Sequence, residues 1–161
     1  MLTGGSENSL AAEAAITIAS AKPAQIVIAA RTKAKVDPVI EAIRAVDASI
    51  QVDFLPVDLA DNASVRKAAA ELNALVFHID VLINSAGVMA KKNYETSKDG
   101  VELHFAANHL GHFLLTKLVL EKIVKAKGRV VNVSSMAYFI AEADTEDPNF
   151  EVGTALTSRR A

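Results

Sequence analysis

Two residues near the middle of the chain have the spacing of a catalytic acid–base pair. Tyr94 precedes Lys98 by four residues in the run 93–98, and a nearby cation is a known way to activate a phenol for proton transfer. Such a phenol must also reach the reacting oxygen. The run is polar and lies directly before the turn signal of Asp99 and Gly100. We therefore expect a loop that leads into a helix, not a catalytic pair.

Other residues that can do chemistry follow apolar runs. The runs 25–30, 50–57, 79–84 and 129–135 are rich in β-branched residues and predict buried strands. The residues at or just after their ends are Arg31, then Asp58 with Leu59, then 84–87, and finally Ser134 with Ser135. In an open parallel sheet, ligands bind beyond the carboxyl ends of the strands. These residues are therefore the candidates for a site.

The segments between these runs have the apolar spacing of helices. Helices are predicted at 9–19, 37–46, 61–76 and 99–125. Asp37 is the expected N-cap of the second, with Pro38 after it, and Asp99 that of the last, with Glu102 placed to answer the cap. Strands that alternate with helices predict an α/β fold, a doubly wound parallel sheet of the Rossmann type with right-handed crossovers.

Composition excludes several classes of function. The 161 residues have the length of one domain, and the net charge of −2 provides no field that would attract nucleic acid or anionic lipid. There is no cysteine, which excludes disulfides and thiolate metal sites. We find neither an apolar run of about 20 residues nor a secretory leader, so we expect a soluble cytoplasmic protein without a membrane span.

Three histidines surround the polar centre of the last predicted helix. His104 and His112 lie four residues on either side of Asn108 and share its face, whereas His109 points elsewhere. No His-Glu-x-x-His arrangement accompanies them. We expect no metal site, and we expect the histidines to make local hydrogen bonds.

Four motifs, in order along the chain, resemble those of the short-chain dehydrogenase/reductase family. They are Thr3-Gly4 at a Gly-rich turn, "NSAG" at 84–87, "ANHLGHF" at 107–113 and "VVNVSS" at 130–135. Each is weak alone, but four in the right order on the right elements are specific. The resemblance covers residues 3 to about 150, so we expect a dinucleotide-binding domain at 1–150 and a divergent tail at 151–161. The pieces "LAD", "NHLGHF" and "EDPNF" are most similar to the branch of retinol dehydrogenases and WW-domain oxidoreductases.

The resemblance implies an NAD(P)-dependent oxidoreductase that acts on a small apolar alcohol or carbonyl. The implied cofactor-binding residues are Thr3, Gly4, Gly5, Arg31, Asp58, Leu59, Asn84, Ala86 and Gly87, and the implied catalytic residues are Asn108 and Ser135. An arginine at position 31 suits a 2′-phosphate, which favours NADP over NAD. The alternatives are a solvated arginine and a plain strand–helix turn at residues 3–5. Glu7 in that turn would repel a pyrophosphate.

Two parts of the family pattern are not found. The family has a Tyr-x-x-x-Lys pair after the catalytic serine, but here the only later tyrosine is Tyr138, followed four residues on by Glu142, and no lysine follows Ser135. Of the family's central first strand only Met1 and Leu2 precede Thr3. We therefore expect a chain truncated at both ends, with an incomplete sheet of about four strands and two unpaired edges that face each other.

Whether such a chain is an enzyme stays open at this point. It is either impaired or inactive in catalysis, a non-catalytic dinucleotide-binding module, or a fragment without function. The sequence also leaves its substrate and any homo-oligomer undetermined.

Overall fold

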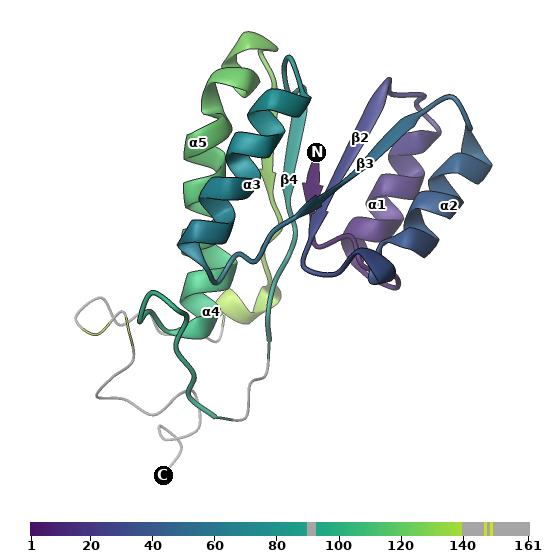
Figure 1. Cartoon of the computed structure of the whole chain (residues 1–161). Helices are drawn as coiled ribbons and strands as arrows, with labels where there is room; N and C mark the ends of the chain where they lie inside the picture. The colour runs from purple at the N-terminus through teal and green to yellow at the C-terminus, as the bar shows by residue number, and fades with distance from the viewer. Residues whose placement is uncertain (90–92, 140–146, 148, 150–161) are drawn as a thin grey trace.

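The chain forms a parallel sheet between two layers of helices. The computed structural model describes residues 1–89, 93–139, 147 and 149. Five strands have the order β3-β2-β1-β4-β5 (Figure 1). They are β1 (Leu2–Thr3), β2 (Gln25–Ala30), β3 (Gln51–Pro56), β4 (Val81–Asn84) and β5 (Arg129–Asn132). All the pairings between strands are parallel, which confirms the predicted α/β class.

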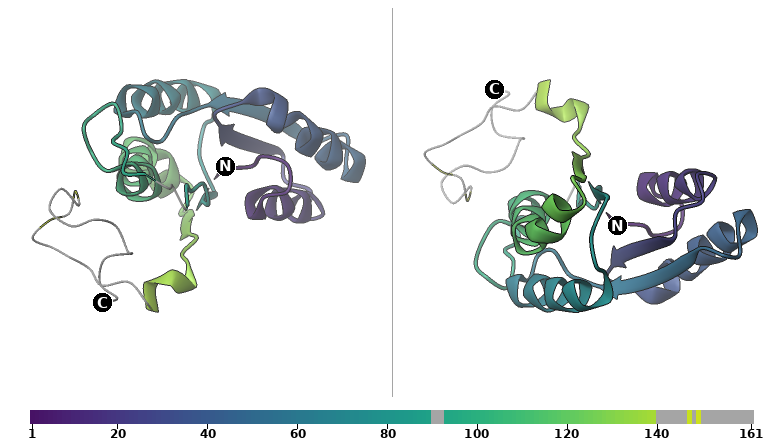
Figure 2. Two further views of the ribbon diagram at one scale, coloured as in Figure 1. Left: turned by 90° about the horizontal axis from the view of Figure 1, so that it is seen from below. Right: turned by 90° about the horizontal axis from the view of Figure 1, so that it is seen from above.

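The four longer helices each bury apolar residues against the sheet. The α-helices are α1 (Leu10–Ala19), α2 (Asp37–Val46), α3 (Asn62–Leu75), α4 (Leu103–Phe105) and α5 (Gly111–Lys125). The short or irregular turns are η1 (Lys33–Lys35), η2 (Ala106–Leu110) and η3 (Met136–Phe139). Figures 1 and 2 show α1 with α2 on one face and α3 with α5 on the other. Each face has its own core cluster, one around Ile28 and Ile43, the other around Leu72 and Leu115.

The central strand differs from the expectation of two facing, unpaired edges. Leu2 is paired with both Ile28 of β2 and Ile83 of β4, and the backbone N–H of Ile83 donates to the carbonyl of Met1 at 3.0 Å. The sheet therefore has five strands, not four. Two residues suffice to join the carboxyl ends of β2 and β4, because each strand residue offers backbone groups to one of its neighbours.

Two helix starts also differ from the prediction. Asp37 is the first residue of α2 and forms an ion pair with Lys33, so Val36 takes the cap position. The last helix begins at Leu103, because Glu102 itself is the N-cap and accepts from the backbone N–H groups of residues 104 and 105. Asp99 instead accepts from the backbone N–H of Asn62 at 2.9 Å. The sequence offers Asp61 or Asn62 as the cap of the third helix, and Asp61 is the cap, since its Oδ1 accepts from the backbone N–H groups of Ala63 and Ser64.

Candidate functional site

The turn after β1 and the loop after β4 touch at the carboxyl end of the sheet. Gly4 has a φ of 81°, and a Cβ there would lie 2.6 Å from the Cα of Ala86. A Cβ on Gly5 would lie 2.6 Å from Ile28 on the next strand. At position 4, only glycine permits both the left-handed conformation and the close approach to Ala86. The predicted Gly-rich turn and the "NSAG" loop are thus brought together.

Thr3 holds this contact through its hydroxyl. The side chain is fully buried, and Oγ1 accepts from the backbone N–H groups of Ser85 and Ala86, each at 3.0 Å. The same oxygen lies 2.8 Å from Nε2 of His112. Because Oγ1 of Thr3 accepts both of these bonds, its own hydroxyl proton is donated to His112, and Nε2 of His112 is the acceptor. The enclosed Thr3 side chain positions the 84–87 loop, and the expected contribution of Thr3 to cofactor binding stays a prediction.

His112 completes a buried connection from β1 to the long helix. Its Nδ1 lies 3.1 Å from the backbone carbonyl of Asn108, so this nitrogen carries the hydrogen in the neutral ring. Burial lowers the pKa of His112, against the opposing effect of the Asn108 carbonyl. The ring is therefore a neutral bridge, which confirms the expected local role for this histidine. A separation of 109 residues from Thr3 kept this partner out of reach of sequence reasoning.

Asn108 lies within a π-helical segment, Ala106–Leu110, that joins α4 to α5. Its side-chain Oδ1 accepts from the backbone N–H of Val88 at 2.8 Å, and its Nδ2 donates to the Val88 carbonyl at 2.9 Å. A π-helical turn inside an α-helix is frequent at functional sites. Asn108 thus lies in a distorted turn, and its side chain holds the loop that follows Gly87.

A second close backbone contact joins the start of α5 to the loop after β3. A Cβ on Gly111 would lie 2.2 Å from the carbonyl oxygen of Leu59. In this loop Asp58 accepts from the backbone N–H of Ala60 at 3.0 Å, and its own N–H donates to Ser64. Glycine is a poor helix former, but at position 111 the contact with Leu59 requires it.

The turn between β1 and α1 lies beside the segment that follows β2. Ser9 caps α1 by accepting from the backbone N–H of Ala12 at 3.1 Å, and its hydroxyl donates to the Gly4 carbonyl at 2.9 Å. The N–H of Glu7 donates to the carbonyl of Lys35 at 2.8 Å. Arg31 is exposed directly after β2, and within the described residues its guanidinium has no ion-pair partner. Lys35 is a further exposed cation here that the sequence prediction missed.

Asn84 and Ser135 lie at the carboxyl ends of β4 and β5. Asn84 is buried, and its Nδ2 donates to Oγ1 of Thr116 at 3.1 Å and to Oδ1 of Asn132 at 2.8 Å. The side chain therefore ties β4 to β5 and α5, and the expected place of Asn84 along a cofactor stays a prediction. Ser135 is exposed in the segment between β5 and η3, at the position predicted for a catalytic serine.

The Tyr94 and Lys98 side chains diverge. Lys98 donates to Oδ2 of Asp61 at 2.5 Å, at the start of α3, whereas the Tyr94 hydroxyl donates to the backbone carbonyl of Asn149 at 2.9 Å. This hydrogen bond of Asp61 is the main cause that lowers the pKa of its carboxyl group. The run 93–98 is a loop, as expected, and the pair does not act as one unit.

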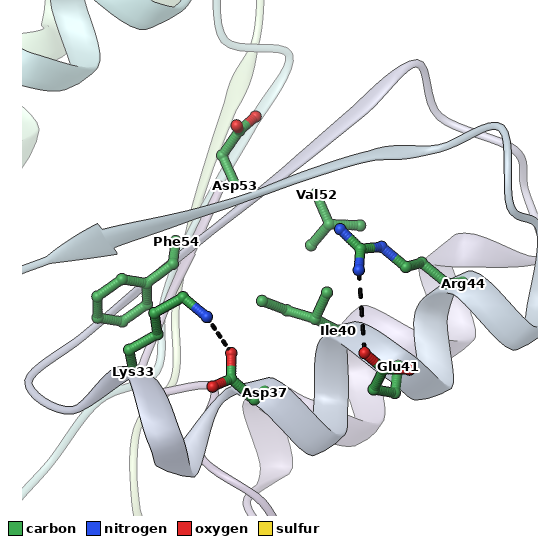
Figure 3. A pocket seen from close by; sticks show the side chains of 8 residues that line it. All are labelled: Lys33, Asp37, Ile40, Glu41, Arg44, Val52, Asp53 and Phe54. Atoms are coloured by element: carbon green, nitrogen blue, oxygen red, sulfur yellow. Dashed lines mark hydrogen bonds and ion pairs between the residues drawn. The ribbon is translucent and has the colours of Figure 1, made fainter.

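A hollow on the outer edge of the sheet is a weaker candidate for a site. Figure 3 shows it between α2 and the edge strand β3. Its charged side chains are already paired: Lys33 with Asp37, Arg44 with Glu41, and Asp53 with the side-chain amides of Gln25 and Gln51. A ligand phosphate would have to displace these partners, so the carboxyl end remains the stronger candidate.

Among the residues that the structure describes, no cluster of three His, Cys, Asp or Glu side chains could hold a metal ion. In the same residues no helix has the length and apolar character needed to cross a membrane.

Comparison with known proteins agrees with the motifs. A family model described as short chain dehydrogenase matches residues 1–145. Retinol dehydrogenase 12 of Homo sapiens is 40% identical over 144 residues, which are 89% of this chain and 45% of that protein. The oxidoreductase fscI of Fusarium equiseti is 34% identical over 155 residues, 93% of this chain and 60% of that one. The chain spans about half the length of the curated relatives it matches.

Solved structures share the fold. A protein from Mycobacterium paratuberculosis is 36% identical with a TM-score of 0.76, covering 95% of this chain and 52% of that one. A metagenomic short-chain oxidoreductase, solved in complex with NADP, is 26% identical with a TM-score of 0.71, covering 84% of this chain and 62% of its own. The chain therefore belongs to the short-chain dehydrogenase family, in its retinol dehydrogenase-like branch, a family of oxidoreductases that bind a nicotinamide dinucleotide.

Proposed function

We propose that the chain forms the NADP-binding half of an oxidoreductase site for apolar alcohols or carbonyls. The single observation that carries the proposal is the set of contacts at the carboxyl end of the sheet. There the Gly4 turn meets Ala86, Asn108 clamps Val88, and Gly111 packs on Leu59. Bound NADP would supply hydride exchange, and the chain would bind and orient it.

The turn after β1 fits a pyrophosphate in its shape. Gly4 and Gly5 carry no side chains over it, and the first N–H groups of α1 attract negative charge. The backbone of Ala86 and Gly87 would lie along the centre of the cofactor, and Asp58 with Leu59 beside its adenine. Glu7 is exposed in the same turn and opposes the anion, so we expect weaker binding than a turn without this carboxylate would give.

Arg31 supports NADP as the partner in preference to NAD. Its guanidinium is exposed beyond β2, and Lys35 adds positive charge nearby. A guanidinium binds a phosphate through paired, charge-assisted hydrogen bonds, which a ribose hydroxyl cannot match. One structural relative contains NADP. The exposed Arg31 would be the residue that binds the 2′-phosphate and so distinguishes NADP from NAD.

The catalytic roles that we propose for this chain are limited to Ser135 and Asn108. Ser135 would donate to a substrate carbonyl. The amide of Asn108 is committed to Val88, so its contribution would be to position the 87–88 loop. Since the 161-residue polypeptide has no Tyr-x-x-x-Lys after Ser135, we propose that by itself it binds NADP without turnover. The relatives named retinol dehydrogenases suggest an apolar alcohol as the substrate class.

Binding of NADPH and NADH to the purified chain, followed by nucleotide fluorescence, tests the cofactor assignment. We expect tighter binding of NADPH, and we expect Arg31→Ala to weaken it by about tenfold or more while NADH binding changes little. Arg44→Ala is the matched control, since Arg44 is an exposed arginine of α2 paired with Glu41 at 3.9 Å. Equal affinities for the two nucleotides would refute the role of Arg31.

Oxidation of NADPH with a panel of aldehydes and ketones tests the proposal that the chain by itself has no turnover. We expect no turnover above the background without protein. Turnover that Ser135→Ala abolishes would show that the chain is an active enzyme. Absence of nucleotide binding, together with no cooperative thermal transition, would instead favour a fragment without function.

A further inference from the structure

The loop 93–102, which leads into α4, is attached to α3 near its middle. Lys98 forms an ion pair with Asp61, the N-cap of α3, and Asp99 accepts from the backbone N–H of Asn62 at 2.9 Å. Both partners on α3 follow directly after the loop that ends β3, where we place the adenine. The adenine side of the proposed site is therefore joined to the loop 93–102 by the loop's own side chains.

Asn149 holds the end of the same loop from a distant part of the chain. Its Oδ1 accepts from the backbone N–H of Glu102 at 2.5 Å, and its Nδ2 donates to the carbonyl of Gly100 at 3.3 Å. The backbone carbonyl of Asn149 accepts from the Tyr94 hydroxyl at 2.9 Å. Three hydrogen bonds thus join one residue to both ends of the run 94–102, across 47 to 55 residues of sequence.

Glu102 is the residue through which this contact reaches the helix. It is 7% exposed, and its carboxylate caps α4 by accepting from the backbone N–H groups of residues 104 and 105. In a capping box the side chain at the third helical position accepts in return from the backbone N–H of the cap residue. Here that position is Phe105, whose side chain has no acceptor. Asn149 therefore supplies the bond that the helix cannot make for itself.

The turn that carries Asn108 follows directly after this cap. Figure 1 shows α4 at the carboxyl end of the sheet, and α4 runs on into the π-helical segment, where Asn108 binds the backbone of Val88 through both atoms of its amide. Val88 follows Gly87, which we place along the centre of the cofactor, so this clamp lies toward the nicotinamide. Because helix ends fray when their N–H groups lack partners, the clamp depends on the cap at Glu102.

We propose that Asn149 is a positioning residue for the nicotinamide end of NADP, an inference that rests on the proposed function. Asn149 acts through Glu102 and Asn108, not by contact with the nucleotide. It keeps the first turn of the helix formed, so that Asn108 holds the backbone of Val88 in place. The adenine end is held separately, by the bonds of Lys98 and Asp99 to α3. Loss of the Asn149 side chain therefore affects one end of the cofactor and leaves the other unchanged.

Two nucleotides test this division, NADPH and adenosine 2′,5′-bisphosphate, which lacks the nicotinamide half. Their affinities for the full chain are measured by calorimetry. Asn149→Ala should weaken NADPH binding by about fivefold or more, because a buried N–H loses its partner, and should leave bisphosphate binding unchanged. Damage to the whole fold would weaken both nucleotides equally, so equal losses would overturn the proposal, as would no loss for either. Failure of the unmodified chain to bind either nucleotide would refute the proposed function itself.

Hydrogen exchange measured by NMR follows the clamp without nucleotide. In Asn149→Ala the amides of Glu102 and Val88 should exchange about tenfold faster or more. Asn149→Asp keeps an acceptor for the Glu102 N–H and should restore both slow exchange and NADPH affinity. Asn93→Ala is the matched control, because Asn93 is exposed in the same loop and makes none of the three bonds. Unchanged exchange of the Glu102 amide in Asn149→Ala would show that Asn149 does not hold the cap, and would overturn the proposal.

Discussion

The two ends of this sheet are built in opposite ways. At the carboxyl end, the buried side chains of Thr3 and His112 bond to each other and to backbone groups, and glycines at 4 and 111 bring backbones into contact. At the amino end, a buried amine and open strand backbone border an apolar cavity of about 540 Å³. The two residues of β1 lie at the boundary between these regions.

The difference shows that a short β1 is enough to organise the loops of the site. Thr3 and Gly4 make the contacts to the 84–87 loop, and Leu2 supplies the pairing to β2 and β4. Strand residues further upstream would add burial and pairing at the amino end only. We therefore expect substitutions at the carboxyl end to cost stability and cofactor binding together, whereas changes at the amino end should affect stability alone.

The largest effect is expected from Gly111→Ala. Its Cβ would lie 2.2 Å from the Leu59 carbonyl oxygen, and neither backbone can retreat without moving a core element. We expect a loss of at least about 3 kcal/mol in the free energy of unfolding, the upper end for overpacking, measured by urea denaturation. Gly100→Ala is the control, because Gly100 has a φ of 77° but open space around it. It should lose only the conformational cost of about 1 kcal/mol. Equal losses would show that the contact with Leu59 yields easily.

The next largest effect is expected from Thr3→Val, which keeps the shape but removes the hydroxyl. The N–H groups of Ser85 and Ala86 and the Nε2 of His112 would lose their partner in a buried site. We expect a loss of about 2–3 kcal/mol in unfolding free energy, together with weaker NADPH binding because the 84–87 loop is released. Thr3→Ser is the matched control and should keep the hydrogen bonds. Unchanged NADPH binding by a folded Thr3→Val chain would separate this network from the site.

Elements that depend on local sequence were predictable. The β-branched run that became β2 was predicted with the bounds 25–30, because continuous apolar residues fit a strand buried on both faces. Asp61 was a predictable cap, since its oxygens bind backbone only two and three residues ahead. Three of the four family motifs also located the carboxyl end of the sheet correctly, because they fall at the ends of strands, whereas the fourth, 107–113, lies in the π-helical segment and the start of α5.

Features that depend on distant partners were not predictable. Asp99 had the sequence of a helix cap, but it satisfies the N–H of Asn62, 37 residues away, so the helix begins later. The same holds for Thr3 with His112 and for Gly111 with Leu59, which meet only after the sheet forms. The one available signal was the pair of poor helix formers at Asn108 and Gly111, which marks the π-helical turn. No such signal marked the apolar cavity at the amino end of the sheet, because it is bordered by residues of five separate elements.

The smallest effect is expected from the Met1 amine, and it tests the amino end alone. Its pKa is about 6 in the folded chain, against 8.0 for an exposed amine. Between these values the unfolded chain binds more protons than the folded one, so stability rises with pH from 6 to 8 and is flat below 6. We expect a gain of about 2 kcal/mol over this window, measured by urea denaturation.

The acetylated chain is the control for this pH dependence. It keeps the titration of His112, whose lowered pKa places its contribution at lower pH, but it lacks the amine. The difference between the two forms therefore isolates Met1. Identical pH profiles for the acetylated and unmodified chains would show that the amine is not buried. The Met1 amine would then no longer distinguish the amino end of the sheet from the carboxyl end.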